Sequence, residues 1–174
     1  LSLQIEKRPT WVNGSRKIRK TITRANGTIV ETLEGYDPRL TYRTGQVSVP
    51  ESTTITTPGG LSATISLEKL VELTGNNYET YQPSMLTKVT DKVSINDRTS
   101  SSVYDVAAKT ITTTSAADRQ SVSYLDDKGR VIKEQVPGLV DVYYNYDSRG
   151  RLTEVRQGEG ELARTTTFSY DDNG

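Results

Sequence analysis

Hydrophobic residues along this chain recur in short runs, mostly at every second position. The clearest run covers residues 140–146, where Val140, Val142, Tyr144 and Tyr146 fall on one face of an extended segment. Alternation over about 4–8 residues, bounded by Gly, Pro, Asn or Asp, is typical of half-buried β-strands. The pattern therefore predicts an all-β protein of tandem β-hairpins forming a repeat sheet, with at most one short helix.

The N-terminal part contains the clearest predicted hairpin, at residues 16–34. It follows a predicted strand over residues 1–8 that ends at Pro9. The hairpin turn is Asn26-Gly27, and these residue types favour the two positive φ angles of a type I′ turn.

A two-residue turn would pair Ala25 with Thr28 and fix the rest of that register. It places Ile22 opposite Glu31, Lys20 opposite Leu33 and Arg19 opposite Glu34. One face is then expected to carry Ile18, Ile22, Ile29 and Leu33 between Lys20, Arg24 and Glu31. The basic cluster at residues 16–20 could bind phosphate, but the opposing Glu31 and Glu34 favour a solvated strand.

The middle of the chain is divided by turn-forming residues. A second hairpin is predicted from strands 52–57 and 61–67 around Pro58-Gly59-Gly60. Residues 66–74 fit two alternatives, a helix that Gly75 ends or a further strand of the repeat sheet. The other expected elements are a turn at Asp37-Pro38, a loop at 76–83, a strand at 85–95 and a turn at Asn96-Asp97.

From residue 103 the alternation becomes regular, and we divide the chain into residues 1–96, with degenerate repeats, and a repeat array at 97–174. The predicted strands of the array are 103–114, 121–124, 131–136, 140–146, 152–157 and 162–170. The predicted turns are 115–120, Pro137-Gly138 and 158–160.

A motif recurs within this array: a Tyr is followed by an Asp-rich turn that closes on Gly. It reads Tyr124-LDDKG, Tyr146-DSRG and Tyr170-DDNG, with steps of 22 and 24 residues between the tyrosines. In the motif, Gly permits positive φ, Asp can accept hydrogen bonds from the turn backbone, and Tyr supplies a large ring. The motif residues are Tyr104, Asp105, Tyr124, Asp126, Gly129, Arg130, Tyr146, Asp147, Gly150, Arg151, Leu152, Tyr170, Asp171 and Gly174.

Composition narrows the chemistry. The chain has 22 basic and 22 acidic residues, so its charge favours neither nucleic acid nor an anionic membrane. It has no His and no Cys, which excludes Ser-His-Asp, Cys-His and Cys/His zinc arrangements within these residues. Asp126-Asp127 and Asp171-Asp172 lack the ligand spacing of an EF-hand, so turn chemistry is favoured over calcium. We predict no catalytic residue, metal, cofactor, nucleic-acid partner or membrane-inserted segment.

The strings YDVAAKTITTTSAADRQSVSYLDDKGRV, VPGLVDVYYNYDSRGRLTEVRQGEG and TTTFSYDDNG resemble the YD repeats of bacterial Rhs proteins. Similar repeats occur in the B/C components of insecticidal Tc toxins and in teneurins. The resemblance is strongest at residues 97–174 and weaker at 14–67. The sequence departs from the motif where Leu125 follows Tyr124 and where Tyr104-Asp105 lacks a following Gly, so altered turns are expected there.

The resemblance implies a spiral of β-hairpins that closes into a hollow shell around a C-terminal polymorphic toxin. The repeats would be non-catalytic, their partners would be other repeats and the toxin of the same polypeptide, and the protein would be secreted or at the bacterial cell surface. The chain has no initiator Met and stops inside its third motif, so we expect a piece of a longer polypeptide.

Two other functions remain open on the sequence. One is a cell-surface adhesion or carbohydrate-binding module, for which Tyr143 is the candidate contact, because it lies on the other face from Tyr144. The other is an enzyme that uses a pair of carboxylates, although no two of the acidic residues stand out for that role.

Overall fold

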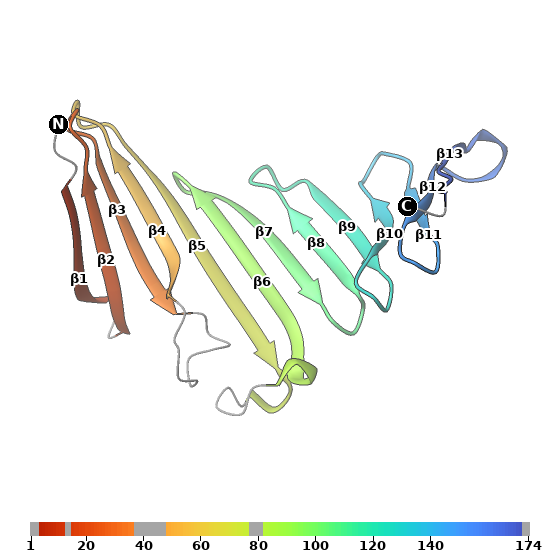
Figure 1. The fold of residues 1–174 in the computed structure, drawn as a ribbon, viewed down its shortest axis with the longest axis horizontal. Coiled ribbons are helices and arrows are strands. Elements are labelled where there is room, and N and C mark those ends of the chain that lie inside the picture. The colour runs from red at the N-terminus through yellow and green to blue at the C-terminus, as the bar shows by residue number, and fades with distance from the viewer. Residues whose placement is uncertain (1–3, 13–14, 37–47, 77–81, 172–174) are drawn as a thin grey trace. The chain divides into compact units, whose positions relative to one another are not determined.

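A computed structural model describes residues 4–12, 15–36, 48–76 and 82–171 of the chain. These residues form thirteen β-strands that pair in chain order, each beside the next (Figure 1). No α-helix occurs in these ranges, only 3-10 turns at Thr74–Asn76, Pro83–Met85 and Gly160–Leu162. The predicted all-β class of tandem hairpins is therefore confirmed. None of the described helices is long and apolar enough to cross a membrane.

The chain forms two compact units, Leu1–Ser101 and Ser102–Gly174. The strands of the first unit are β1 Gln4–Val12, β2 Ser15–Thr23, β3 Ile29–Tyr36, β4 Ser48–Thr56, β5 Ser62–Leu73 and β6 Leu86–Ile95, and β7 Arg98–Asp105 begins there. The strands of the second unit are β8 Thr110–Thr114, β9 Gln120–Leu125, β10 Val131–Gln135, β11 Val142–Tyr146, β12 Leu152–Gln157 and β13 Arg164–Thr167.

In the first unit, alternation along the strands places successive side chains on opposite faces of one sheet layer. Ile5, Ile22, Val30 and Ile55 lie opposite one another on successive strands. Ser52, Ser66 and Ser94 form a corresponding row on the other face. The buried apolar side chains of the described part of this unit are Val71, Leu73 and Val89. The sheet therefore has a small core of its own.

The register predicted for the first hairpin is wrong by one residue. The turn has three residues, because Arg24 N–H donates to the Thr28 carbonyl and Gly27 N–H donates to the Arg24 carbonyl, both at 2.9 Å. Gly27 alone takes a positive φ, at 82°. The pairs are Ile22 with Val30, Lys20 with Thr32, Arg19 with Leu33 and Ile18 with Glu34. This slip puts Ile18 and Ile22 on one face with Val30, and Ile29 and Leu33 on the other.

Two positive φ values, which a type I′ turn requires, occur instead at Asn96 and Asp97, at 46° and 67°. The turn predicted at Asn96-Asp97 is therefore confirmed, and it has the geometry that was expected at Asn26-Gly27. The turn around Pro58-Gly59-Gly60 is also confirmed: Thr57 N–H donates to the Leu61 carbonyl at 2.8 Å.

Residues 66–73 lie in a strand and Thr74 begins a 3-10 turn, so the α-helical alternative is wrong. Strand β5 runs through Leu73 and matches β6 at nine positions, from Ile65 opposite Ile95 to Leu73 opposite Leu86. Its burial alternates, with Val71 and Leu73 buried and Glu72 exposed between them. The ladder with β6 overrides the weak local preference for a helix.

The end predicted for the first strand, at Pro9, is also wrong. Strand β1 continues through Pro9 to Val12, and Pro9 lies opposite Ile18. Within the described residues β1 pairs with β2 alone, so Pro9 can face outward without breaking a hydrogen bond of the ladder.

The second unit consists of short strands joined by tight turns. The strand predicted for residues 103–114 is interrupted by a turn between β7 and β8, where Lys109 has φ +51°. The turns predicted at 115–120, Pro137-Gly138 and 158–160 are confirmed. The Asp37-Pro38 turn, Gly174 and residues 77–81 of the predicted loop lie outside the described residues.

Candidate functional site

The turn between β9 and β10 is organised around the carboxylate of Asp126. Its Oδ1 accepts hydrogen bonds from the backbone N–H groups of Lys128 and Arg130, both at 2.9 Å. Its Oδ2 accepts from Nε and Nη2 of Arg130 at 2.7 and 2.6 Å. These bonds from Arg130 hold the pKa of Asp126 below its usual value. Both carboxylate oxygens are thus engaged within the turn.

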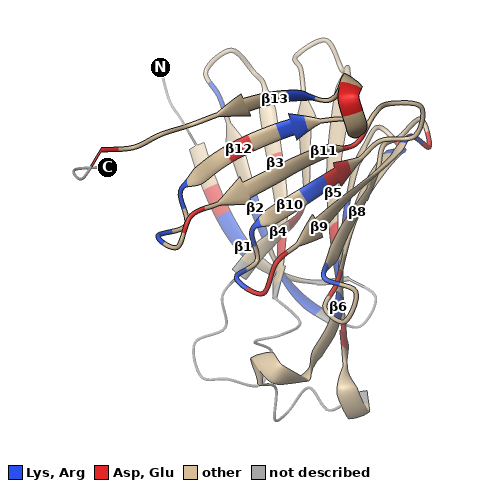
Figure 2. Ribbon diagram, turned by 90° about the vertical axis from the view of Figure 1, so that its right-hand side faces the viewer, with Lys and Arg blue, Asp and Glu red and all other residues tan. Residues whose placement is uncertain are grey.

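The turn between β11 and β12 repeats this arrangement. Asp147 Oδ1 accepts from Arg151 N–H, and Asp147 Oδ2 accepts from Arg151 Nε, both at 2.8 Å. The Arg151 side chain is the main cause of a lowered Asp147 pKa, followed by its backbone N–H. Figure 2 shows acidic and basic residues together in the turns that join these strands.

Each arginine also reaches the tyrosine of the next repeat. The guanidinium of Arg130 lies 4.5 Å from the centre of the Tyr146 ring, and the Tyr146 hydroxyl donates to the Val131 carbonyl at 2.7 Å. Arg151 stands in the same relation to Tyr170, whose hydroxyl donates to the Leu152 carbonyl at 2.7 Å. We call each set of Asp, Arg and following Tyr a clamp, because it ties one repeat to the next.

Gly150 lies directly against the first clamp. A Cβ on Gly150 would be 3.4 Å from Nη1 of Arg130. Gly150 also has φ +85°, a conformation that glycine adopts without strain. The Gly of one repeat therefore both closes its own turn and leaves room for the arginine of the preceding repeat.

The structure shows that the first motif aligns with the second on its Asp and not on its Tyr. Asp126 occupies the same place in its turn as Asp147, so Leu125 is the counterpart of Tyr146, and Tyr124 the counterpart of Asn145. The turn expected to be altered after Tyr124 is therefore not altered. Aligning the sequence on Asp instead of Tyr would have shown this, since LDDKGRV then matches YDSRGRL position by position.

The turn after Tyr104 does differ. Asp105 Oδ1 accepts from Ala108 N–H at 2.9 Å, and Lys109 takes the positive φ that Gly has in the later motifs. Lys109 forms an ion pair with Asp127, which raises the Lys109 pKa. Thr110 follows Lys109, where the later motifs have Arg after Gly. The β7–β8 turn therefore lacks the arginine of a clamp, and the next repeat has Leu125 at the position where a clamp has its tyrosine.

Tyr143 lies on the other face of β11 from Tyr144, and cations flank its ring. Lys133 on β10 is 5.3 Å from the ring centre, and Arg156 on β12 is 4.5 Å from it. The Tyr143 hydroxyl donates to Glu159, and this bond is the main cause of a raised Tyr143 pKa. The candidate contact residue is therefore half-buried among side chains of its own sheet.

Tyr144, on the opposite face, donates to Glu134 Oε2 at 2.8 Å. Burial, together with Glu134, raises the pKa of Tyr144 to about 12. This tyrosine therefore stays protonated and contributes packing and one hydrogen bond to the sheet.

The described residues contain no group of three or more Asp and Glu side chains placed to hold a metal ion. In the motif, the carboxylates of Asp126 and Asp147 already accept bonds from the turn and from arginine. Such carboxylates fix backbone geometry, whereas a general base needs a lone pair directed at substrate. The chemistry that this arrangement supports is the joining of repeats.

Comparison with known proteins agrees with this interpretation. No curated protein matches the chain. A family model described as Teneurin YD-shell matches residues 3–174, which include the N-terminal strands as well as the repeat array. The resemblance to YD-repeat proteins is thereby confirmed, and the chain belongs to the teneurin YD-shell family.

Proposed function

We propose that this chain is a non-catalytic wall segment of a YD-repeat shell that encapsulates or presents a C-terminal toxin of the same polypeptide. The observation that carries the proposal is the arrangement of one sheet layer with few buried side chains. In the described residues the buried apolar set is Val71, Leu73, Val89 and Leu125. A layer of this kind separates two sides and leaves side chains on both of them available for contact.

The mode of extension supports the same function. Every strand pairs with the next one in the chain, so further hairpins lengthen the sheet without altering what precedes them. The clamps tie neighbouring hairpins through side chains. Under this proposal the segment is secreted or displayed at the bacterial cell surface, and its main partners are adjoining repeats and the enclosed region.

Limited proteolysis of the full-length polypeptide that contains this chain tests the proposal. We expect the region C-terminal to the repeats to be cleaved at least about tenfold more slowly than the same region expressed alone, because the wall excludes protease. A mass-spectrometric time course provides the measurement. Equal cleavage rates would contradict encapsulation.

A carbohydrate-binding module is the second candidate, because Tyr124, Lys133, Tyr143 and Arg156 form a row of aromatic and basic side chains on one face. We rank it lower, since Lys133, Arg156 and Glu159 already contact Tyr143. A glycan array would decide: binding by the native chain that Tyr143→Ala abolishes supports this function, and no binding to any glycan ends it.

A further inference from the structure

The ladder between β4 and β5 stops before either strand ends. Its last pair is Ser52 opposite Ser66. Beyond this pair, residues 48–50 of β4 remain paired with β3, and residues 67–73 of β5 remain paired with β6. The two strands therefore diverge and leave a cavity of about 740 Å³, which we call the β4–β5 slot.

A β-bulge lies where the two strands diverge. Leu33 lies opposite Ser52 and Glu34 lies opposite Pro50, so Glu51 is an extra residue in β4. The Glu51 carboxylate forms an ion pair with Lys17 and occupies the space above Gly35, where a Cβ would lie 1.9 Å from Glu51 Oε1. Gly35 and Lys17 thus hold the bulge in place, and the slot is part of the fold.

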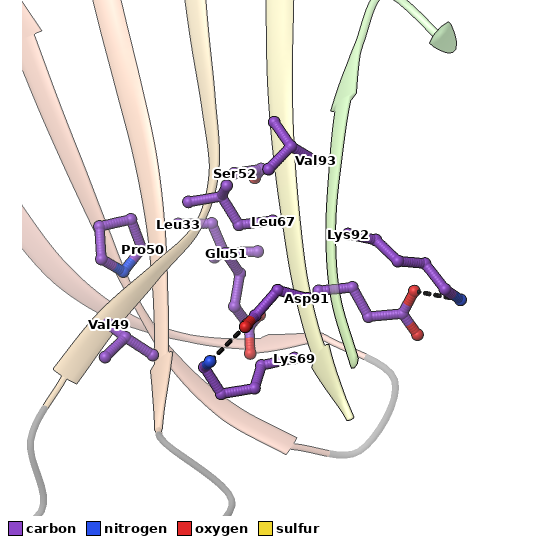
Figure 3. Close-up of a pocket in the computed structure, with 11 residues that line it drawn as sticks. Leu33, Val49, Pro50, Glu51, Ser52, Leu67, Lys69, Asp91, Lys92 and Val93 are labelled. Carbon is purple, nitrogen blue, oxygen red and sulfur yellow. Dashed lines mark hydrogen bonds and ion pairs between the residues drawn. The ribbon is translucent and has the colours of Figure 1, made fainter. Parts of the chain in front are cut away.

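The walls of the slot are apolar and its charges are paired. Figure 3 shows Val49 and Pro50 on the β4 side and Lys92 and Val93 on the β6 side, with Leu33 and Leu67 between them in this view. Lys69 pairs with Asp91, and Lys92 pairs with Glu68 at 2.9 Å. Because Lys17 forms an ion pair with Glu51, each charged side chain that lines the slot has a partner of opposite sign. An occupant therefore needs no charge of its own.

The geometry points to an extended, uncharged apolar stretch of polypeptide as the occupant, seated between β4 and β5 opposite residues 67–69. Two strands that diverge offer backbone groups to an added strand, and alternate side chains of that strand would enter the apolar space. The cavity volume falls within the range of about 300–1,000 Å³ that is usual for ligand sites. This inference rests on the proposed function, because it takes the stretch to come from the enclosed C-terminal region.

Site-specific photocrosslinking in the full-length polypeptide tests the inference with a matched pair of positions. Leu67 lines the slot and is 40 % exposed, whereas Leu70 is 46 % exposed and does not line it. A benzophenone amino acid is placed at either position and the products are mapped by mass spectrometry. We expect Leu67 to yield at least about tenfold more crosslink than Leu70, to peptides without Asp, Glu, Lys or Arg from beyond the repeats.

Equal yields at the two positions, crosslinks to charged peptides, or crosslinks to a second copy of the chain would overturn the inference. If either substituted protein fails to fold, hydrogen exchange of the unsubstituted polypeptide gives the answer. Slower exchange at residues 67–69 than in a polypeptide lacking the C-terminal region supports the occupant, and unchanged exchange overturns it. The protease assay separates the two proposals, because a protected C-terminal region with an empty slot leaves encapsulation intact.

Discussion

Strands β1–β6 of the first unit run for 8–12 residues, whereas β8–β13 of the second unit run for only 4–6. The long strands are held chiefly by their ladders, as in the nine matched positions of β5 and β6. Ladders in the second unit are shorter; β10 and β11, for example, match at two positions. Both clamps, Arg130 with Tyr146 and Arg151 with Tyr170, lie in this second unit.

The difference indicates what the Tyr-Asp motif is for. In the first unit, the β2–β3 and β4–β5 hairpin turns contain no Tyr-Asp pair, and their strands still join the sheet. A backbone hydrogen bond contributes only about 0.5–1.5 kcal/mol net, so a short ladder with few such bonds stabilises its pair of strands less than a long one. At the two turns that carry it, the clamp compensates: an ion pair within the turn holds the Arg, and the stacked ring and the hydroxyl bond link that hairpin to the next.

The largest effect is expected from removing the clamp ring. Tyr146→Ala should destabilise the second unit by about 2–3 kcal/mol, because it removes the contact with Arg130 and the hydrogen bond to the Val131 carbonyl. Tyr146→Phe is the control, since it keeps the ring and should cost only about 1 kcal/mol. Denaturant unfolding followed by residue-resolved hydrogen exchange measures both. Equal losses for the two variants would show that the ring does not join the repeats.

Sequence reasoning succeeded where local residue chemistry decides the structure. Turn positions were accessible because Gly, Pro, Asn and Asp select backbone conformations locally, as at Pro58-Gly59-Gly60 and Asn96-Asp97. Strand alternation was accessible for the same reason: of the strand predicted at residues 140–146, residues 142–146 form β11, although Val140 lies outside it. The family resemblance then supplied the repeat architecture, which local patterns alone would not specify.

Properties that depend on pairing across strands were not accessible. Asn26-Gly27 fits both a two-residue and a three-residue turn, and only the completed ladder selects Ile22 opposite Val30. Residues 66–74 have helical and strand patterns of similar strength, and β6 decides between them. Nothing in the spacing of Arg130 and Tyr146 shows that they touch, because their contact joins a turn to the following hairpin.

A smaller effect is expected at the glycines, where the chain offers a matched pair. Gly60 in the first unit and Gly150 in the second have φ of +83° and +85°, so an added Cβ strains both backbones alike, by about 1–2 kcal/mol. A Cβ on Gly60 meets nothing within 4 Å, whereas one on Gly150 meets Arg130 Nη1 at 3.4 Å. Gly150→Ala should therefore lower the free energy of unfolding more than Gly60→Ala does. A greater loss for Gly60→Ala in thermal unfolding would contradict this order.

Acidification should weaken the second unit through its turn carboxylates. The pKa values of Asp126 and Asp147 are lowered by Arg130 and Arg151, so the unfolded chain binds protons more readily than the folded one. Their stabilisation is fully present above the unfolded pKa of about 4 and is lost as the pH falls through the lower folded pKa. Asp126→Asn with Asp147→Asn should be less stable than the native chain at pH 7 and approach it near pH 2. A stability difference that does not change with pH would show that these charges are not coupled to folding.

The smallest effect is expected from a side-chain hydrogen bond in the first unit. Thr54 Oγ1 and Thr64 Oγ1 lie 2.9 Å apart across β4 and β5. Thr54→Val removes this bond but keeps a β-branched side chain, so the free energy of unfolding should fall by no more than about 0.5 kcal/mol. Tyr124→Phe is the counterpart in the second unit, since it removes a 2.7 Å bond to Gln135, and it should cost about 1 kcal/mol. If Thr54→Val is the more damaging variant, the first unit also depends on side-chain bonds, and the contrast between long ladders and clamped short ones is wrong.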